Sequence, residues 1–177
     1  GSLNTSFFGH LMITLDRREP AIKAGDWLLN FVRANEDYMR KKGLMYTQMT
    51  PDGDLITDVK PGEKYSKILN NKDAKQEFWH VGTSMAYLAS LYDTMKSRWG
   101  YSDSASKPYL EAAIELLEFE KTMPLYTYLW PSKCKVGWGA GELLRVLTKH
   151  REDADEQVET AHRVAKLVAV FTFMDNQ

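Results

Sequence analysis

Apolar residues recur at spacings of three and four along most of the chain, a period that predicts amphipathic α-helices. The clearest stripe lies between residues 78 and 99 and consists of Phe78, Val81, Met85, Leu88, Tyr92 and Met95. Three small residues, Gly82, Ser84 and Ala86, interrupt the bulky side chains of this segment. Because small residues let two helix axes approach closely, we expect this helix to lie in the core with another helix packed tightly against it.

The same period predicts further helices before and after this central one. The expected helices cover residues 5–17, 20–40, 78–99, 107–122, 137–150 and 153–174. Short connections make consecutive helices antiparallel neighbours, which gives three pairs. The sequence therefore predicts an all-α fold of three antiparallel helical hairpins in a single domain, residues 1–177. Gly1 and Ser2 resemble residues left by an expression vector and are set aside.

One segment departs from the helical period. Residues 44–49 alternate, residues 50–54 contain the turn-forming Pro51 and Gly53, and residues 55–59 are again extended in pattern. This arrangement predicts a small β-hairpin inserted into the helical body. Residues 60–76 show no regular period, and we expect them to form a loop that covers the start of the central helix.

Composition narrows the range of functions. The formal net charge is −1 and no block of like charge is present, which disfavours a nucleic-acid partner. No apolar run approaches the roughly 20 residues that a membrane-spanning helix needs, so the chain is expected to be soluble. The lone Cys134 excludes an intrachain disulfide and favours a reducing compartment such as the cytoplasm. The sequon at residues 4–6 leaves glycosylation of Asn4 open.

Aromatic residues make up 12% of the chain, and many lie in expected loops or helix starts. Our candidate substrate-binding residues are Trp79, Tyr126, Tyr128, Trp130, Lys133, Lys135 and Trp138. Indole and phenol rings bind sugars and apolar rings, and the two lysines suit an anionic group. Glu77 and His80 are the candidate catalytic residues, because a carboxyl group and an imidazole can transfer protons. Packing in the core and at its rim is the alternative role of the same aromatic residues.

No cofactor or metal site is predicted. The aspartates in residues 52–58 do not fit the spacing of a calcium-binding EF-hand loop. The glycines in residues 137–141 follow a loop instead of a strand, so they fail the context of a dinucleotide-binding fingerprint.

Several segments resemble pieces of the (α/α) toroids, the helical barrels of the six-hairpin glycosidases and of the terpenoid cyclases and prenyltransferases. They are AGDWLL at 24–29, PDGDL at 51–55, WGAGELL at 138–144 and FMDNQ at 173–177. The chain resembles half of such a ring, which implies either a fragment of a larger toroid or a homodimer that completes the ring. The resemblance also implies a ligand above the starts of the inner helices. The acidic motifs of terpene synthases and protonating cyclases are absent, which disfavours terpenoid cyclisation.

Two functions remain open from the sequence. The first is a toroid-type enzyme or enzyme fragment, a hydrolase, lyase or cyclase acting on a glycan-like or other small organic substrate. The alternative is a non-catalytic helical domain that binds another protein through the aromatic segment from Tyr126 to Trp138. Convergence of His80, Trp130 and Trp138 in a concave pocket favours the enzyme, and a flat or convex aromatic patch favours protein binding.

Overall fold

Most of the chain is helical, which confirms the all-α prediction. The structure is a computed structural model; it describes residues 1–150 and 155–174, with side chains up to residue 168. In chain order the elements are α1 (Ser2–Thr14), α2 (Arg18–Lys42), β1 (Leu44–Tyr46), the 3₁₀ helix η1 (Pro61–Glu63), α3 (Lys64–Lys67), β2 (Ile68–Asn70), α4 (Trp79–Ser97), α5 (Asp103–Lys121), the 3₁₀ helices η2 (Leu125–Leu129) and η3 (Pro131–Lys133), α6 (Cys134–His150) and α7 (Asp155–Met174). Residues 175–177 of the closing FMDNQ segment lie outside the described residues.

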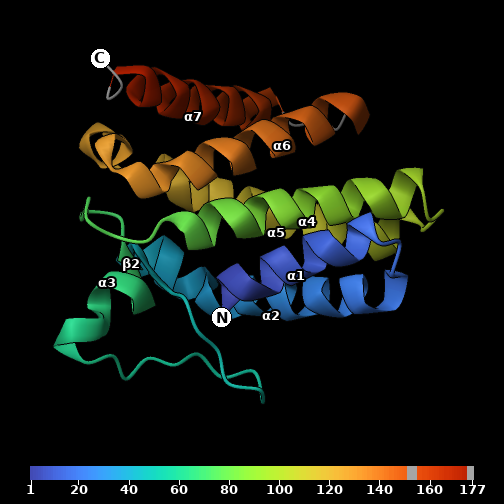
Figure 1. Cartoon of the computed structure of the whole chain (residues 1–177), viewed down its shortest axis with the longest axis horizontal. Coiled ribbons are helices and arrows are strands. Elements are labelled where there is room, and N and C mark those ends of the chain that lie inside the picture. Colours follow the sequence, from blue (N-terminus) through green and yellow to red (C-terminus); the bar gives the residue numbers. More distant parts are fainter. Residues whose placement is uncertain (151–154, 175–177) are drawn as a thin grey trace.

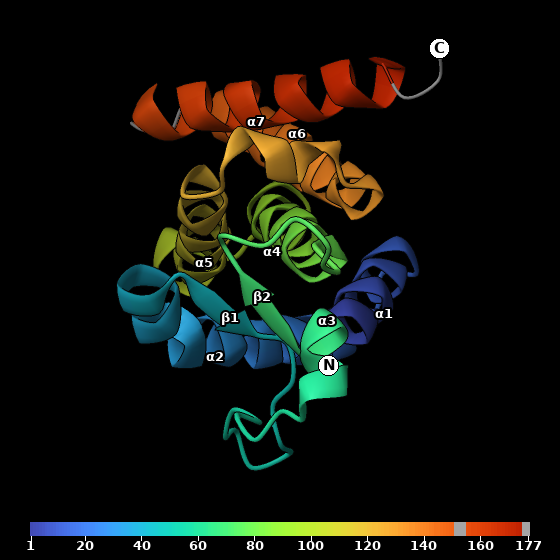
Figure 2. The same cartoon turned by 90° about the vertical axis from the view of Figure 1, so that its left-hand side faces the viewer.

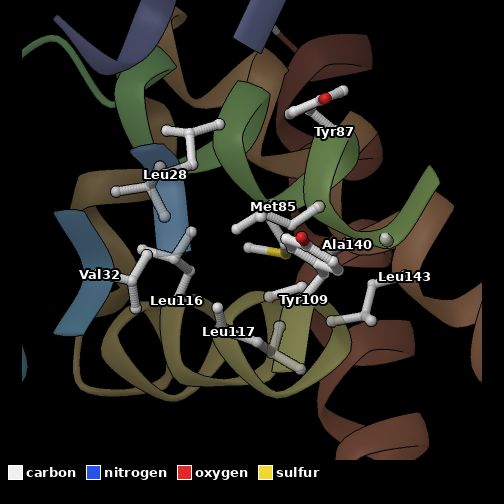
Figure 3. Close-up of a cluster of buried hydrophobic side chains, with 14 of the residues drawn as sticks. Leu28, Val32, Met85, Tyr87, Tyr109, Leu116, Leu117, Ala140 and Leu143 are labelled. Carbon is white, nitrogen blue, oxygen red and sulfur yellow. The ribbon is translucent and has the colours of Figure 1, made fainter. Parts of the chain in front are cut away.

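Helix α4 occupies the middle of the molecule, and α1, α2, α5 and α6 surround it (Figure 2). Every residue from His80 to Ala89 is buried. Figure 3 shows how side chains of the neighbouring helices meet there, with Leu28 from α2, Leu117 from α5 and Leu143 from α6. The prediction that residues 78–99 form the core helix is confirmed, because this segment carries apolar or small side chains on every side.

The long helices form three hairpins, which follow one another across the molecule from α1 and α2 through α4 and α5 to α6 and α7 (Figure 1). Consecutive helices pair as α1 with α2, α4 with α5 and α6 with α7. The first members also contact one another, α1 with α4 and α4 with α6, while α5 contacts both α2 and α7. Figure 2 shows α1, α4 and α6 along one side, with α2, α5 and α7 around the outside. The three predicted hairpins are therefore present, and their membership of a toroid stays a prediction.

The three first helices run parallel, and side-chain contacts fix their register. Ser2 Oγ lies 2.9 Å from His80 Nδ1, and one turn further along both helices Ser6 Oγ lies 3.2 Å from Ser84 Oγ. On the other side of α4, Ser90 donates to Glu142 at 2.7 Å. Since residue numbers rise together along each pair, the amino-terminal ends of α1, α4 and α6 lie at the same end of the molecule.

The closest helix contact joins α4 to the first turns of α6. A Cβ at Gly82 would overlap the backbone of Lys135 and Val136, and one at Gly139 would overlap the carbonyl group of Gly82. Only glycine therefore permits this separation. The expected close approach of a helix to this part of α4 is confirmed, and it accounts for glycine inside α6, where it lowers helix propensity.

The predicted β-hairpin is present only as a single bridge, between Met49 and Leu55. Its turn is closed by the hydrogen bond from Thr50 N to Asp54 O, 2.8 Å. The regular strand partner of β1 is instead β2, with Met45 opposite Leu69 in an antiparallel register. The prediction that residues 60–76 are an aperiodic loop is therefore wrong for β2 and α3. Strands of three residues are too short to show a readable period, and pairing across more than twenty residues leaves no local signal.

No helix in the described ranges is both long and apolar enough to cross a membrane.

We predict that Gly82→Ala lowers the free energy of unfolding by about 2 to 4 kcal/mol, because the added methyl group forces α4 and α6 apart. Gly141→Ala is the matched control, since a Cβ there meets nothing within 4 Å. This control should raise the stability by about 0.5 to 1 kcal/mol through helix propensity. Urea denaturation followed by circular dichroism measures both changes, and equal stabilities of the two variants would contradict the packing described here.

Candidate functional site

The candidate catalytic residues lie at the first turn of α4. His80 is 8% exposed, and its Nδ1 lies 2.9 Å from the hydroxyl of Ser2, which is fully buried. Its Nε2 lies 3.7 Å from Glu77 Oε2, beyond the length of a hydrogen bond. Burial lowers the pKa of His80 to about 4, with a further contribution from the nearby terminal amino group. The imidazole is therefore neutral at pH 7 and adjacent to a half-buried carboxyl group.

The aromatic loop between α5 and α6 is built around a buried ion pair. Lys133 is 1% exposed and Glu120 is fully buried, and the ammonium binds Glu120 Oε2. The ammonium also lies 3.7 Å from the ring centroid of Phe78 and 4.6 Å from that of Tyr128. Tyr128 itself is buried and donates a hydrogen bond to the Glu120 carbonyl oxygen at 3.2 Å. Two candidate binding residues, Tyr128 and Lys133, therefore anchor the loop to the core.

Burial acts against the charged forms of both partners in this pair. It raises the pKa of Glu120 and lowers the pKa of Lys133, while their mutual attraction opposes each change. The second carboxylate oxygen, Glu120 Oε1, is buried and accepts no hydrogen bond from the described residues. Removing one partner of such a pair strongly destabilises the folded protein, because the other partner is then left buried and unpaired.

The remaining residues of the loop are less enclosed. Tyr126 is 51% exposed and its hydroxyl donates to the carbonyl oxygen of Lys72 at 2.6 Å. Trp130 is partly buried against the hydrophobic core. Leu125 and Leu129 are 55% and 59% exposed. The 3₁₀ helix η2 therefore presents apolar side chains outward, while η3 turns Lys133 inward.

Trp138 lies apart from this loop, on the second turn of α6. It is 40% exposed, and its ring stacks on His10 of α1 with a centroid distance of 5.1 Å and an interplanar angle of 29°. The ammonium of Lys135 lies 5.6 Å from the same indole. His10 thus joins α1 to α6 across α4, and its Nε2 is buried without a hydrogen-bond partner among the described residues.

A carboxylate adjoins this aromatic pair. Glu142 lies one turn after Trp138. Burial lowers the pKa of His10, and the negative charge of Glu142 offsets only part of this change. Burial would raise the pKa of Glu142 itself, but hydrogen bonds from Arg145 and Ser90 outweigh that effect and lower it. Glu142 is therefore ionised at neutral pH.

The structure brings some of the candidate residues together and separates others. Glu77 adjoins His80, Lys135 adjoins Trp138, and Tyr128 adjoins Lys133. Trp79 is the first residue of α4 and is partly buried. Convergence of His80 with Trp130 and Trp138 in one cavity stays a prediction.

Four of the surface cavities formed by the described residues are lined mostly by other side chains, although Tyr128 lines the smallest of the four. The largest has a volume of about 370 Å³ and is lined by Leu44, Lys64, Tyr65, Ile68, Asn70, Asp73, Lys75 and Gln76. It adjoins the candidate site, because the backbone nitrogen of Glu77 donates to the carbonyl oxygen of Tyr65 at 3.4 Å. Two cavities of 220 and 330 Å³ follow the groove between α2 and α5, and one of 40 Å³ lies beside η2 and α7.

Sequence reasoning missed three residues that shape these sites. Ser2 was set aside as a vector remnant, yet its buried hydroxyl orients His80. Glu120 falls in line with Ala113 and Leu116 in the expected helix 107–122, and a charged residue in such an apolar stripe is the available signal that it has a buried partner. Glu142 follows Trp138 by four residues, the helical spacing that places both on one face.

Among the described residues, no group of three or more His, Cys, Asp or Glu side chains lies close enough to hold a metal ion. Comparisons with protein-family models, with curated proteins and with solved structures gave no match for this chain.

We predict that Lys133→Met lowers the free energy of unfolding by about 3 to 5 kcal/mol at pH 8, since it leaves the Glu120 carboxylate buried and unpaired. The loss should shrink toward pH 5. A carboxyl group whose pKa is raised in the folded state favours folding below its unfolded pKa and disfavours it as the pH rises. Adding Glu120→Leu should restore most of the stability. Denaturant melts at both pH values test this, and an unrecovered double variant would contradict it.

The lowered pKa of His80 predicts a second pH dependence. The unfolded chain binds a proton at His80 near pH 6.5, whereas the folded protein binds it only near pH 4. Stability conferred by the neutral form is therefore lost as the pH falls through this window, by up to about 3 kcal/mol. His80→Gln should abolish this component, which is measured as the difference between the wild-type and variant stability curves from pH 7 to 4. Parallel curves would contradict a buried neutral imidazole.

Proposed function

We propose that this chain is a toroid-type enzyme, or part of one, that binds a glycan-like or other small organic molecule on the side formed by α1, α4 and α6. We call this side the inner face and define it by His10, Trp79, Lys135, Trp138 and Glu142. The observation that supports the proposal best is the parallel arrangement of the three first helices, with their starts at one end and the second helices outside them. Toroids share that arrangement.

The chemistry of the inner face suits a ring-shaped ligand. The exposed part of Trp138 offers a flat apolar surface. Stacking on His10 holds the indole in place and covers only one of its two faces. Lys135 and Glu142 lie beside it and supply a cation and an anion for hydroxyl or charged groups of the ligand. A rigid aromatic ring with a few polar neighbours is the usual composition of a small-molecule site.

Proton transfer on this face would fall to carboxyl groups. Glu142 is ionised, which suits a base or an electrostatic stabiliser of developing positive charge. Glu77 lies at the start of α4 beside His80, and we assign it the role of the general acid. Glu142 contacts Ser90, 13 residues or about 20 Å further along α4, so the two carboxyl groups serve different parts of the ligand. His80 itself is neutral and hydrogen-bonded to Ser2, so we assign it a positioning role.

The cavity beside Glu77 offers a further place for part of the ligand at the start of α4. Its volume of about 370 Å³ falls within the range of small-molecule sites. Tyr65 is 46% exposed there, and Lys64 and Lys75 supply positive charge. An acidic sugar or another small anion fits these groups better than a cation does.

A second candidate function rests on η2. Leu125, Tyr126 and Leu129 are each more than half exposed within a single short helix. Exposed apolar side chains that cluster in this way often mark a binding site for another protein. This favours the alternative in which the loop binds an apolar peptide segment and the inner face has no catalytic role.

We predict that Trp138→Ala weakens binding of the proposed ligand at least tenfold, because stacking on the indole is lost. Titration of the protein with short neutral and uronate-containing oligosaccharides, followed by calorimetry, measures the dissociation constants. Leu129→Ala is the matched control on the opposite candidate surface and should bind as the wild type does. Circular dichroism verifies that both variants are folded.

Two outcomes would contradict the enzyme proposal. One is the absence of saccharide binding by the wild-type protein at millimolar concentrations. The other is equal binding by the wild type and Trp138→Ala, which would place the ligand elsewhere. Loss of saccharide binding in Leu129→Ala alone would place the saccharide site at η2 and contradict its assignment to the inner face.

A further inference from the structure

Helix α1 packs against the core with its small residues and exposes its large ones. Ser2, Ser6 and Gly9 are buried, and the ring of Tyr87 fills the space where a side chain at Gly9 would stand. The opposite side carries Phe7, Phe8, Leu11 and Leu15, which are 46%, 48%, 52% and 57% exposed. We call these four residues the α1 outer face. Helix α1 therefore places its large apolar side chains outward, whereas a normal surface helix points them inward.

We propose that the α1 outer face is the interface between two copies of this chain, with α1 of one copy packed antiparallel on α1 of the other. The apolar surface is about half of what such an interface buries in each partner. A Phe or Leu side chain has roughly 200 Å² of surface, so half exposure of four leaves about 400 Å² to bury in each copy. A stable complex buries about 800 Å² per partner. These residues therefore supply the apolar centre, and their neighbours supply the rim.

Charge also favours a second copy over a different partner. Residues 1–15 contain no Asp, Glu, Lys or Arg. A two-fold axis brings each residue close to its own copy, so a charged group at the centre of the interface would meet the same charge. An uncharged apolar face avoids that repulsion. Antiparallel packing also sets the two helix dipoles in opposite directions, which is favourable.

Other surfaces of the molecule match the α1 outer face less well. The exposed side of α7 carries charged residues, among them Glu156, Glu159 and Lys166. The exposed apolar residues of η2 lie within a helix of five residues, about 10 Å long, whereas α1 has 13 residues and is about 20 Å long. A second α1 is the surface that matches in both length and polarity. Since His10 on α1 belongs to the inner face, the partner copy would adjoin that face.

The test is the oligomeric state of a matched pair of variants. Sedimentation equilibrium of the wild-type chain, from micromolar to hundred-micromolar concentration, should give twice the chain mass. Leu11→Lys should raise the dimer dissociation constant at least 100-fold, because two buried ammonium groups would face each other. Leu129→Lys places the same charge at an equally exposed apolar position on η2 and should leave the dimer intact. Both changes lie on the surface, and circular dichroism verifies folding.

A cross-linking measurement tests the geometry independently. In the background Cys134→Ser, which removes the exposed native thiol, Leu11→Cys should form an intermolecular disulfide under mild oxidation, whereas Leu129→Cys should not. A wild type that is monomeric throughout the concentration range overturns the proposal, as does dissociation caused by Leu129→Lys alone. Binding of a monomeric wild type to phosphatidylcholine and phosphatidylserine vesicles, lost in Leu11→Lys, would assign the face to a lipid surface instead.

Discussion

The contact between Gly82 and Gly139 is the constraint on which the arrangement of the helices depends. It brings the backbones of α4 and α6 together without side chains between them. Because α6 lies so close, α4 is enclosed by helices and can be apolar on every side. The same contact sets the register that carries Trp138 to the level of His10. A wider separation of α4 and α6 would open the core and move the indole away from the imidazole that supports it.

Polar groups fix both ends of the α6 helix. At its start, the buried pair of Lys133 and Glu120 holds the preceding loop against α5. Near its end, Asp93 of α4 accepts hydrogen bonds from Arg145, Lys149 and His150. Burial would raise the pKa of Asp93, but these donors outweigh it and hold the pKa well below its usual range. Such charged contacts add specificity of register more than net stability, because their desolvation offsets much of the attraction.

Two surfaces of the molecule differ in what they offer to other molecules. The side formed by α1, α4 and α6 carries a neutral histidine, carboxyl groups and a supported indole. The outer side of α1 offers only apolar groups. Reactive and polar side chains on one surface and uncharged apolar ones on the next are the features expected of a binding face beside an interface. The two proposals are independent, since each rests on its own residues.

The helices were predictable because their signal is local. The stripe from Phe78 to Met95 repeats within a few residues, and Gly43 ends α2 in the left-handed conformation that favours glycine. The small residues Gly82, Ser84 and Ala86 also indicated a close helix contact, though not with which element. By contrast, the pairing of β1 with β2 joins segments more than twenty residues apart, so the hairpin prediction located the turn but not the strand partner.

The candidate site also combines local signals, which the sequence shows, with contacts between distant segments, which it does not. Its aromatic residues could be listed from the sequence, but their roles followed from what packs against them. Lys133 and Tyr128 are buried because Glu120 from another helix meets them, while Trp138 is exposed because His10 covers only one side of its ring. The sequence by itself determined the helices and the chemistry available on each. Tertiary structure decided which groups meet and which stay open, because burial and pKa depend on neighbours that are distant along the chain.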